Sequence, residues 1–453
     1  MLGETANLLN RMIFVALLGL IVFTALPYGT DGTRWETLFE CTAYALGILW
    51  LVEGLIRKSW RVSGLPLVMP AVGLILLALV QTIPLGERTI SADPYETRLF
   101  VFELLALTLT GVLLNQYCST RKRLRALIHT IILVSMASAL FGILRQTTQH
   151  SPGFILPALN PEEGYAQFFN TNHFAFLMEM ALGLVLGLLA GGAVATDRVL
   201  IYLAMAAPMW LAVILSVSRG GILSIFAQLI FIALLCGKVR PSEHRPEQKG
   251  RVLGWLWSIN SSPVVRVVMT VVLLFVVSFT ILWVGGEPLS RRLHAIQVDG
   301  VTSINEEAGN AEVIVRENTN RTEIWKATLR LIAVHPVVGI GFGGYFEAIP
   351  EYHDASGVSV PRQAHNDYLE LLASGGLIGG ILGALFIVLL VGQSRVWLRS
   401  RDPFRRAACF GALAGLFAVA INSFVDFGLH ITINALVLTA LAIIATVSLE
   451  SGV

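Results

Sequence analysis

Residues 375–392, GGLIGGILGALFIVLLVG, form an unbroken apolar run of the length that a membrane helix needs. About 20 helical residues cross a hydrocarbon core of ~30 Å. A polar stretch, RQAHNDYLELLAS (362–374), comes directly before the run. A histidine, an asparagine and an aspartate are therefore predicted to lie together at the start of a membrane helix.

Similar apolar runs recur along the chain. Its 453 residues are 55% hydrophobic and 14% charged, against roughly a quarter charged in an ordinary soluble domain. The first run is expected to be a retained helix, because no small-x-small cleavage site follows it. We predict an all-α polytopic membrane protein with about twelve transmembrane helices, at 12–29, 38–56, 64–84, 98–117, 124–146, 172–193, 198–217, 219–236, 266–285, 372–392, 407–428 and 431–449.

The basic residues predict the orientation of the chain. With the N-terminus in the cytoplasm, the segments on that side hold 20 of the 32 lysines and arginines, including RKSWR (57–61) and RKRLR (121–125). The number of lysines and arginines differs most strongly between the short loops of the two sides, and the positive-inside rule applies to these loops. Both termini are therefore predicted to be cytoplasmic.

The loops divide the chain into four predicted regions. One loop, 286–371, is large enough for its own architecture and is expected outside, partly helical, between the ninth and tenth spans. Within it, RTEIWKATLRLIAVHP (321–336) has the apolar spacing of an amphipathic helix that ends at Pro336. The regions are a five-helix part (1–146), core helices six to nine with a cytoplasmic loop 237–265 (147–285), the outer loop domain (286–371) and helices ten to twelve (372–453).

Metal and nucleotide chemistry find little support in the sequence. The histidines of the outer domain lack HxxxH or HExxH spacing, and the four cysteines lack CxxC spacing, so no metal and no other cofactor is expected. GIGFGG (339–344) matches GxGxxG, but no βαβ unit surrounds it. We predict a tight backbone turn there.

Two arginines stand out on the outer side. Arg219 is the only charge in LAVILSVSRGGILSIF (211–226), which suggests anion binding, although an arginine snorkelling to the interface is the alternative. Arg321 heads the amphipathic helix, where the helix dipole opposes it and an external anion would favour it. An ion pair with Glu317 and a cation–π contact with Trp325 would also account for Arg321.

His365 is the titratable member of the polar stretch. An imidazole with a pKa near neutrality can take a proton from a hydroxyl group. A helix-capping or interfacial histidine is the alternative. Acidic residues inside predicted spans, Glu103, Glu179 and Asp426, lie within roughly 10 Å of the outer surface by helical rise, so polar residues concentrate on that side.

The order of these motifs resembles the O-antigen ligase and polymerase superfamily. The resemblance rests on SVSRGG (216–221), RTEIWKATLRLIAVHPVVGIGFGGYF (321–346) and AHNDYLELLASGGLIGG (364–380), and it extends over roughly 150–445. It implies a metal-independent, inverting glycosyltransferase at the outer face of the bacterial inner membrane. Such enzymes move a glycan from undecaprenyl diphosphate to a hydroxyl on lipid A-core, on another lipid-linked glycan or on a protein.

The resemblance also implies roles for individual residues. Arg219 and Arg321 would hold the diphosphate, and His365 would deprotonate the acceptor hydroxyl. The remaining polar residues would support the site or contact sugar: Asn366, Asp367, Asn170, Asn172, His173 and Asp426.

A ligase-type reaction is favoured, and a polymerase-type reaction remains open as the alternative. A transporter of lipid-linked glycan is the third possible function. A transporter predicts ionisable groups near the bilayer midplane. The expected partners are the lipid-linked donor, a lipid A-core or glycan acceptor and the bilayer, with no nucleic acid.

Overall fold

The computed structural model describes residues 2–58, 65–86, 88–161, 163–236, 321–353 and 361–449. Thirteen α-helices and one hairpin of two short strands, each of two residues, lie in this part of the chain. Eight of the helices are long and apolar enough to cross a membrane, which confirms a multi-pass, all-helical membrane protein. They are α1 (Leu2–Ala25), α2 (Thr33–Arg57), α4 (Pro94–Tyr117), α5 (Arg121–Thr148), α6 (Thr171–Ala190), α7 (Val199–Ser216), α14 (Asp367–Leu398) and α15 (Pro403–Asn422).

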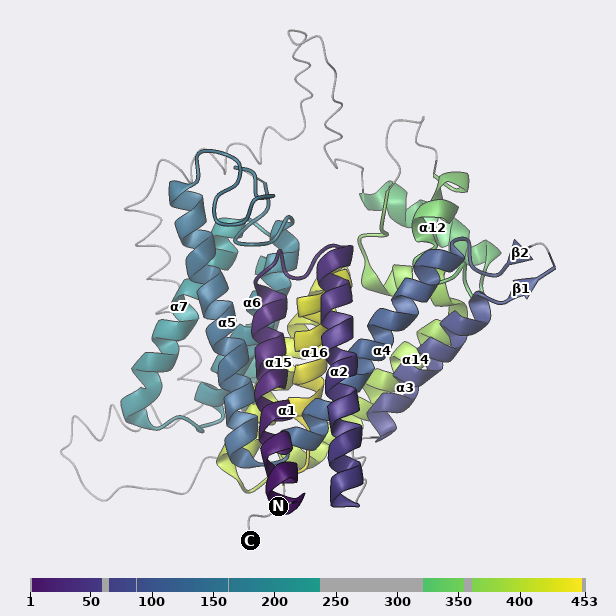
Figure 1. Cartoon of the computed structure of the whole chain (residues 1–453). Helices are drawn as coiled ribbons and strands as arrows, with labels where there is room; N and C mark the ends of the chain where they lie inside the picture. Colours follow the sequence, from purple (N-terminus) through teal and green to yellow (C-terminus); the bar gives the residue numbers. More distant parts are fainter. Residues whose placement is uncertain are drawn as a thin grey trace.

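Three shorter apolar helices coincide with three further predicted spans. These are α3 (Leu65–Gln81), α8 (Arg219–Cys236) and α16 (Thr432–Thr446). The predicted span 266–285, the loop 237–265 and residues 286–320 lie outside the described residues. Figure 1 shows the helices side by side in one bundle, with α12 (Arg321–Val334) at the end opposite the start of α1.

The helix α6 forms the centre of the bundle. All residues from His173 to Ala190 are buried, and α6 packs along α15. Glycines make this close packing possible, because a Cβ at Gly187 would lie 2.1 Å from the Cα of Gly411. Small residues that let two backbones approach are typical of helix pairs in membranes.

A buried polar network ties α8 to this central pair. The Glu179 carboxylate on α6 accepts hydrogen bonds from Ser224 of α8 and, at 3.4 Å, from Asn422 of α15. Gln228 of α8 donates to the Glu179 carbonyl at 2.8 Å and to the Ala414 carbonyl at 3.0 Å. Because each polar group inside a bilayer needs a partner, the network fixes α8 and with it the position of Arg219.

The glycine run 339–344 is a tight turn, as predicted. Gly339 has φ 68°, and a Cβ there would lie 2.4 Å from the Ser374 backbone. The Ile340 and Gly341 amides donate to the Ala373 and Ser374 carbonyls at 3.0 and 3.1 Å. The helix α14 kinks beside it at Gly376, so this segment joins α12 to the start of α14.

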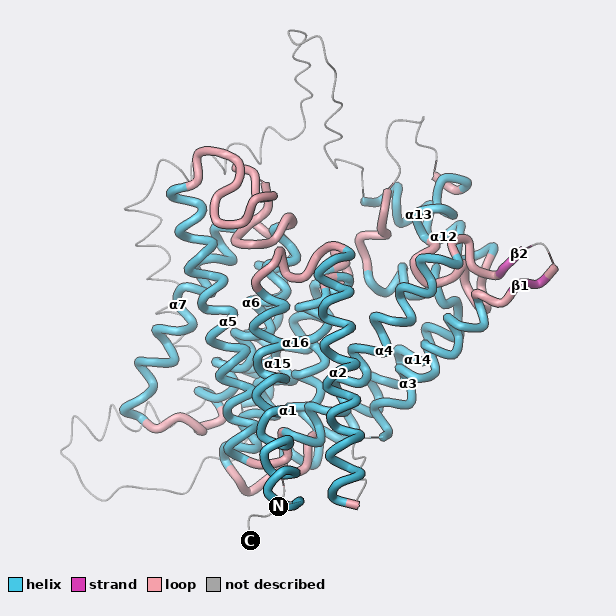
Figure 2. The backbone as a smooth tube through the Cα atoms, viewed as in Figure 1, coloured by secondary structure: helices cyan, strands magenta, loops and turns pink. Residues whose placement is uncertain are grey.

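Loops gather at the two ends of the bundle (Figure 2). At the end that holds α12 lie the hairpin of β1 (Pro84–Leu85) and β2 (Arg88–Thr89) and the short helices α13 (Tyr345–Ala348) and η2 (Ile349–Glu351). Two connections complete the described elements, η1 (Thr196–Arg198) and η3 (Gly428–His430).

Among the helix ends that differ from the prediction, two lie at the predicted site. The predicted span 407–428 ends earlier, because α15 stops at Asn422, and α14 begins at Asp367 rather than at 372. The Ser423 carbonyl accepts the Asp367 amide at 3.0 Å. The Ser423 carbonyl is thus bonded to the start of α14, and α15 does not continue past Asn422. Asp426 therefore lies in the turn between α15 and η3 instead of in a helix.

Candidate active site

His365 lies two residues before α14 in a strained backbone conformation. Its φ is 49°, in the left-handed region that residues other than glycine rarely adopt. Both backbone polar groups of the preceding residue are hydrogen-bonded: the Ala364 amide donates to the Glu370 carboxylate at 2.9 Å, and the Trp325 indole donates to the Ala364 carbonyl at 3.1 Å. Contacts from α12 and α14 therefore fix the position of the imidazole.

Asn366 has a structural place next to it. Its side-chain oxygen accepts the Tyr368 and Leu369 amides, both at 3.0 Å, which caps α14. Its amide nitrogen donates to the Phe424 carbonyl at 2.9 Å. The side chain of Asn366, rather than that of His365, is thus the cap of this helix, and it also ties α14 to the turn after α15.

The imidazole of His365 stands against an aromatic ring from that turn. The rings of His365 and Phe427 meet edge to face, with centroids 4.7 Å apart. His173 of α6 meets the same Phe427 ring at 4.8 Å, also edge to face. Phe427 therefore joins the two histidines, which lie far apart in the sequence.

Asp426 brings His365 and Arg321 together. Its carboxylate is 2% exposed; one oxygen lies 4.0 Å from Nδ1 of His365 and the other 3.5 Å from Nη2 of Arg321. The Phe427 amide donates to Asp426 at 2.9 Å, and Asn172 hydrogen-bonds the same carboxylate. Three segments that are distant in sequence thus place a base, a cation and an acid in one group.

Burial decides the charge of His365. Burial lowers the pKa of the imidazole below its ordinary value, and the Arg321 guanidinium acts in the same direction while the Asp426 carboxylate opposes both. A histidine with a lowered pKa is neutral at pH 7. The neutral imidazole is the form that can accept a proton.

Among the described residues, the Arg219 side chain makes no hydrogen bond or ion pair with this group, but its neighbour Ser218 is linked to the group by hydrogen bonds. Arg219 is the first residue of α8 and is exposed, and Ser218 donates to the Asn172 side chain at 2.7 Å. Asn172 in turn bonds Asp426. Ser218 also accepts the Gly221 amide at 3.1 Å, so it caps α8 and links the Arg219 turn to the site.

The glycines after Arg219 have a packing role. A Cβ at Gly220 would lie 2.3 Å from the Asn422 side chain, and one at Gly221 would lie 2.5 Å from Ala175. They allow the start of α8 to press against α15 and α6. Asn170, another predicted site residue, caps α6 by accepting the Asn172 amide at 2.8 Å.

Sequence reasoning missed Glu370 and His430. Their side chains lie 3.3 Å apart, and the same Glu370 carboxylate holds the Ala364 amide. The carboxylates of Glu370, Asp367 and Glu103 raise the pKa of His430 above its ordinary value. Glu370 lies in the first turn of α14, where an acidic residue resembles an ordinary partner of the helix dipole.

Within the described ranges, no group of three or more His, Cys, Asp or Glu side chains is arranged to hold a metal ion. The polar groups around His365 instead pair a carboxylate with an arginine and an imidazole. Such a set can take a proton and bind an anion.

The fold and this site describe a multi-pass, all-helical membrane protein with an arginine–histidine–aspartate group at one end of the bundle. Residues 204–384 match the family described as O-antigen ligase, which confirms the resemblance for this part of the chain. The match contains Arg219, Arg321 and His365, whereas Asn172 and Asp426 lie outside it. The matched family carries out lipid-linked glycan transfer of the ligase or polymerase type, and residues 204–384 are similar to it. No curated protein matches the chain.

Proposed function

We propose that this protein is an inverting, metal-independent glycosyltransferase of the O-antigen ligase type. It moves a glycan from undecaprenyl diphosphate to a sugar hydroxyl of an acceptor such as lipid A-core. The observation that carries the proposal is the placement of His365 and Arg321 on the two oxygens of one buried carboxylate, Asp426.

His365 acts as the base in this proposal. The acceptor oxygen attacks the anomeric carbon and forms the new C–O bond while its proton passes to the imidazole. The bond between that carbon and the diphosphate oxygen breaks, and undecaprenyl diphosphate leaves with the electron pair. Attack from the face opposite the leaving group inverts the configuration. Asp426 orients the imidazole and stabilises the imidazolium.

Arg219 and Arg321 bind the diphosphate. Arg321 is 43% exposed at the side chain, and Arg219 is exposed, so both guanidinium groups can reach a ligand. Their planar forks match phosphate oxygens in a bidentate manner. They stabilise the charge that develops on the leaving group without a metal ion.

The remaining predicted residues position this group. Asn366 and Asn170 cap the helices that begin at the site, and Asn172 connects Ser218 to Asp426. His173 supports the ring of Phe427. The backbone amide of Asp367 fixes the start of α14 against the turn that carries Asp426.

We propose that the protein lies in the bacterial inner membrane, with both termini in the cytoplasm and the site in the periplasm. Arginines and lysines gather at the end of the bundle opposite His365, where RKRLR begins α5, and this distribution supports the orientation. Residues 286–371 form the periplasmic loop domain in this arrangement, between the ninth and tenth of about twelve spans. The regions 1–146, 147–285 and 372–453 make up the membrane part.

A product assay tests the proposal. The purified protein is incubated with an undecaprenyl-diphosphate glycan, with or without lipid A-core, beside His365→Ala. The exposed His335 of the same outer region offers a matched control, His335→Ala. We expect glycan on lipid A-core from the wild type and the control but not from His365→Ala.

The other outcomes separate the alternatives. Longer lipid-linked glycan formed without lipid A-core would identify a polymerase. Donor that moves across the membrane without any covalent product would identify a transporter and overturn the proposal.

A further inference from the structure

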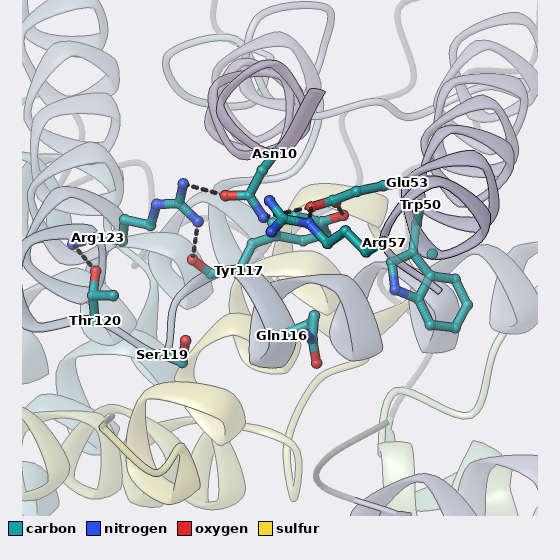
Figure 3. Close-up of a pocket in the computed structure, with 10 residues that line it drawn as sticks. Asn10, Trp50, Glu53, Arg57, Gln116, Tyr117, Ser119, Thr120 and Arg123 are labelled. Atoms are coloured by element: carbon teal, nitrogen blue, oxygen red, sulfur yellow. Dashed lines mark hydrogen bonds and ion pairs between the residues drawn. The ribbon is translucent and has the colours of Figure 1, made fainter. Parts of the chain in front are cut away.

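The side chains drawn in Figure 3 line a cavity of about 480 Å³. The helix α4 runs from the end of the bundle that holds the glycine turn 339–344 to this cavity. Thr97, near the start of α4, donates to the Phe342 carbonyl at 2.5 Å, whereas Tyr117, at its end, lines the cavity. Twenty residues of helix rise ~30 Å, the thickness of a hydrocarbon core. The cavity therefore lies at the opposite membrane interface.

Glu53 is the only carboxylate among the described residues that line the cavity, and its oxygens already accept hydrogen bonds. Glu53 accepts hydrogen bonds from the Tyr117 hydroxyl, from Asn10 at 2.9 Å and from Nε of Arg57 at 2.7 Å. Its charge balances that of Arg57, as the dashed lines in Figure 3 make visible. The described residues that line the cavity offer no further carboxylate to a cation.

Arg123 carries a positive charge without such a balance. Its guanidinium donates to two neutral oxygens, the Asn10 side chain and the Tyr117 carbonyl, and it lies 4.9 Å over the Phe14 ring. Within the described part of the chain, no carboxylate forms an ion pair with it. A half-buried cation in this position favours an anion in the cavity.

Two neutral polar side chains line the same space. The Ser119 hydroxyl and the Gln116 amide lie beside the cavity in Figure 3, and neither makes a side-chain hydrogen bond to another described residue. The first turn of α5 follows Ser119, so the positive end of its dipole faces this region. Together with Arg123 they form a set of donors that suits phosphate oxygens.

We propose that this cavity binds the phosphate of an anionic phospholipid headgroup. Exposed apolar side chains lie on the same helix turns as the lining residues: Leu8 and Met12 on α1, and Leu51 and Leu55 on α2. Because residues two apart lie on opposite sides of a helix, these side chains face away from Asn10 and Glu53, toward the acyl chains of the bilayer. Basic pockets between membrane helices bind such headgroups, and Trp50 at its edge is of the type enriched at membrane interfaces.

Lipid binding to the purified full chain tests this proposal. The probe is dioleoylphosphatidylglycerol, with dioleoylphosphatidylcholine and inorganic phosphate as comparisons, and the readouts are native mass spectrometry and the rise in Tm. Arg123→Gln is compared with Lys122→Gln, an exposed neighbour that does not line the cavity and whose loss changes the net charge equally. We expect Arg123→Gln to raise the apparent Kd for phosphatidylglycerol about tenfold or more and Lys122→Gln to leave it unchanged.

A second variant covers the case in which Arg123→Gln does not fold. Ser119→Leu fills the cavity and leaves the contacts of Arg123 to Asn10 and Tyr117 in place, and it should also weaken lipid binding. Equal loss in Lys122→Gln would show non-specific attraction to a basic surface, and an equal rise in Tm with inorganic phosphate alone would show a site for free phosphate. Retained lipid binding in both cavity variants would equally overturn the proposal.

Discussion

The two ends of the helix bundle each surround one buried carboxylate with arginine, but the contacts differ in length. Glu53, 6% exposed at the side chain, receives Nε of Arg57 at 2.7 Å and Asn10 at 2.9 Å. Asp426, 2% exposed, has the Arg321 guanidinium at 3.5 Å and the neutral His365 imidazole at 4.0 Å. The first group is closed, while the second leaves its cation and its imidazole room to engage a substrate.

This difference separates a structural network from a reactive one. Catalytic hydrogen bonds are often long before substrate binds and shorten in the complex. The strained backbone of His365 also indicates a reactive group. Such strain persists only where the surroundings impose it, and here the hydrogen bonds from Ala364 to Glu370 and from Trp325 to Ala364 do so. A set of substitutions at both ends can test whether the contrast is real.

The largest effect should come from Arg321→Gln. Removing a donor aimed at developing charge costs about 10²–10³ in kcat, and we expect a loss of that size. The matched change at the other end, Arg57→Gln, should leave kcat per folded molecule unchanged. Turnover by both variants, normalised to the folded fraction, checks this, and equal losses of kcat would break the comparison.

A smaller loss is expected for Glu370→Ala. It removes the acceptor of the Ala364 amide and the partner of His430, so the imidazole of His365 loses its fixed position. Hydrogen bonds to charged groups of this kind are worth about 1.5–3 kcal/mol, which corresponds to roughly a ten- to hundredfold loss of kcat. The KM for donor should hold constant, and Glu370→Gln should recover part of the rate by accepting the amide again. A raised donor KM with kcat intact would place Glu370 in substrate binding instead.

Asp426→Asn should change the pH profile as well as the rate. The Asp426 carboxylate raises the pKa of His365, against burial and Arg321, so its loss lowers that pKa further. Activity needs the neutral imidazole and is lost as pH falls through the pKa, so the acidic limb of the profile should move to lower pH. We expect about a tenfold loss at the plateau from the weaker orientation of the ring. An acidic limb that stays in place would argue that His365 is not the titrating base.

The membrane helices could be predicted from sequence because the bilayer sets their length. Eleven of the twelve predicted spans coincide with apolar helices. The turn at 339–344 was also predictable, because glycine can adopt the positive φ values that a tight turn requires. The ends of α14 and α15 could not be predicted in the same way. The apolar run continues past Asn422, and the helix stops there because the Asp367 amide and the Asn366 side chain take the Ser423 and Phe424 carbonyls.

The candidate site was predictable as residue types but not as contacts. Arg219, Arg321 and His365 stood out because their charge or polarity is unusual beside a predicted span. The shared carboxylate joins Arg321 to a residue 105 positions away, a relation that no local spacing reveals. Glu370 and His430 escaped notice since each alone resembles a common surface residue.

Glu53→Gln should act on stability rather than on turnover. The substitution removes the charge that Arg57 pairs with and weakens the acceptor of Tyr117 and Asn10. Because the Arg57 side chain is 38% exposed, solvent screens part of this loss, and we expect about 1–3 kcal/mol. The measurement is the shift in Tm of the purified protein beside its kcat. A fall in kcat per folded molecule with an unchanged Tm would reverse the roles that we assign to the two ends.

The smallest effect is expected for Arg121→Gln. Arg121 pairs with Asp402 at 3.4 Å at the same end as Glu53, but the two side chains are 55% and 30% exposed. An exposed pair gains little, because water screens the attraction and both long side chains lose freedom, so the loss of stability should be about 0.5 kcal/mol or less. Thermal unfolding at low and high salt measures it. A shift as large as that of Glu53→Gln would mean that net charge at this end, rather than the closed geometry around Glu53, stabilises the bundle.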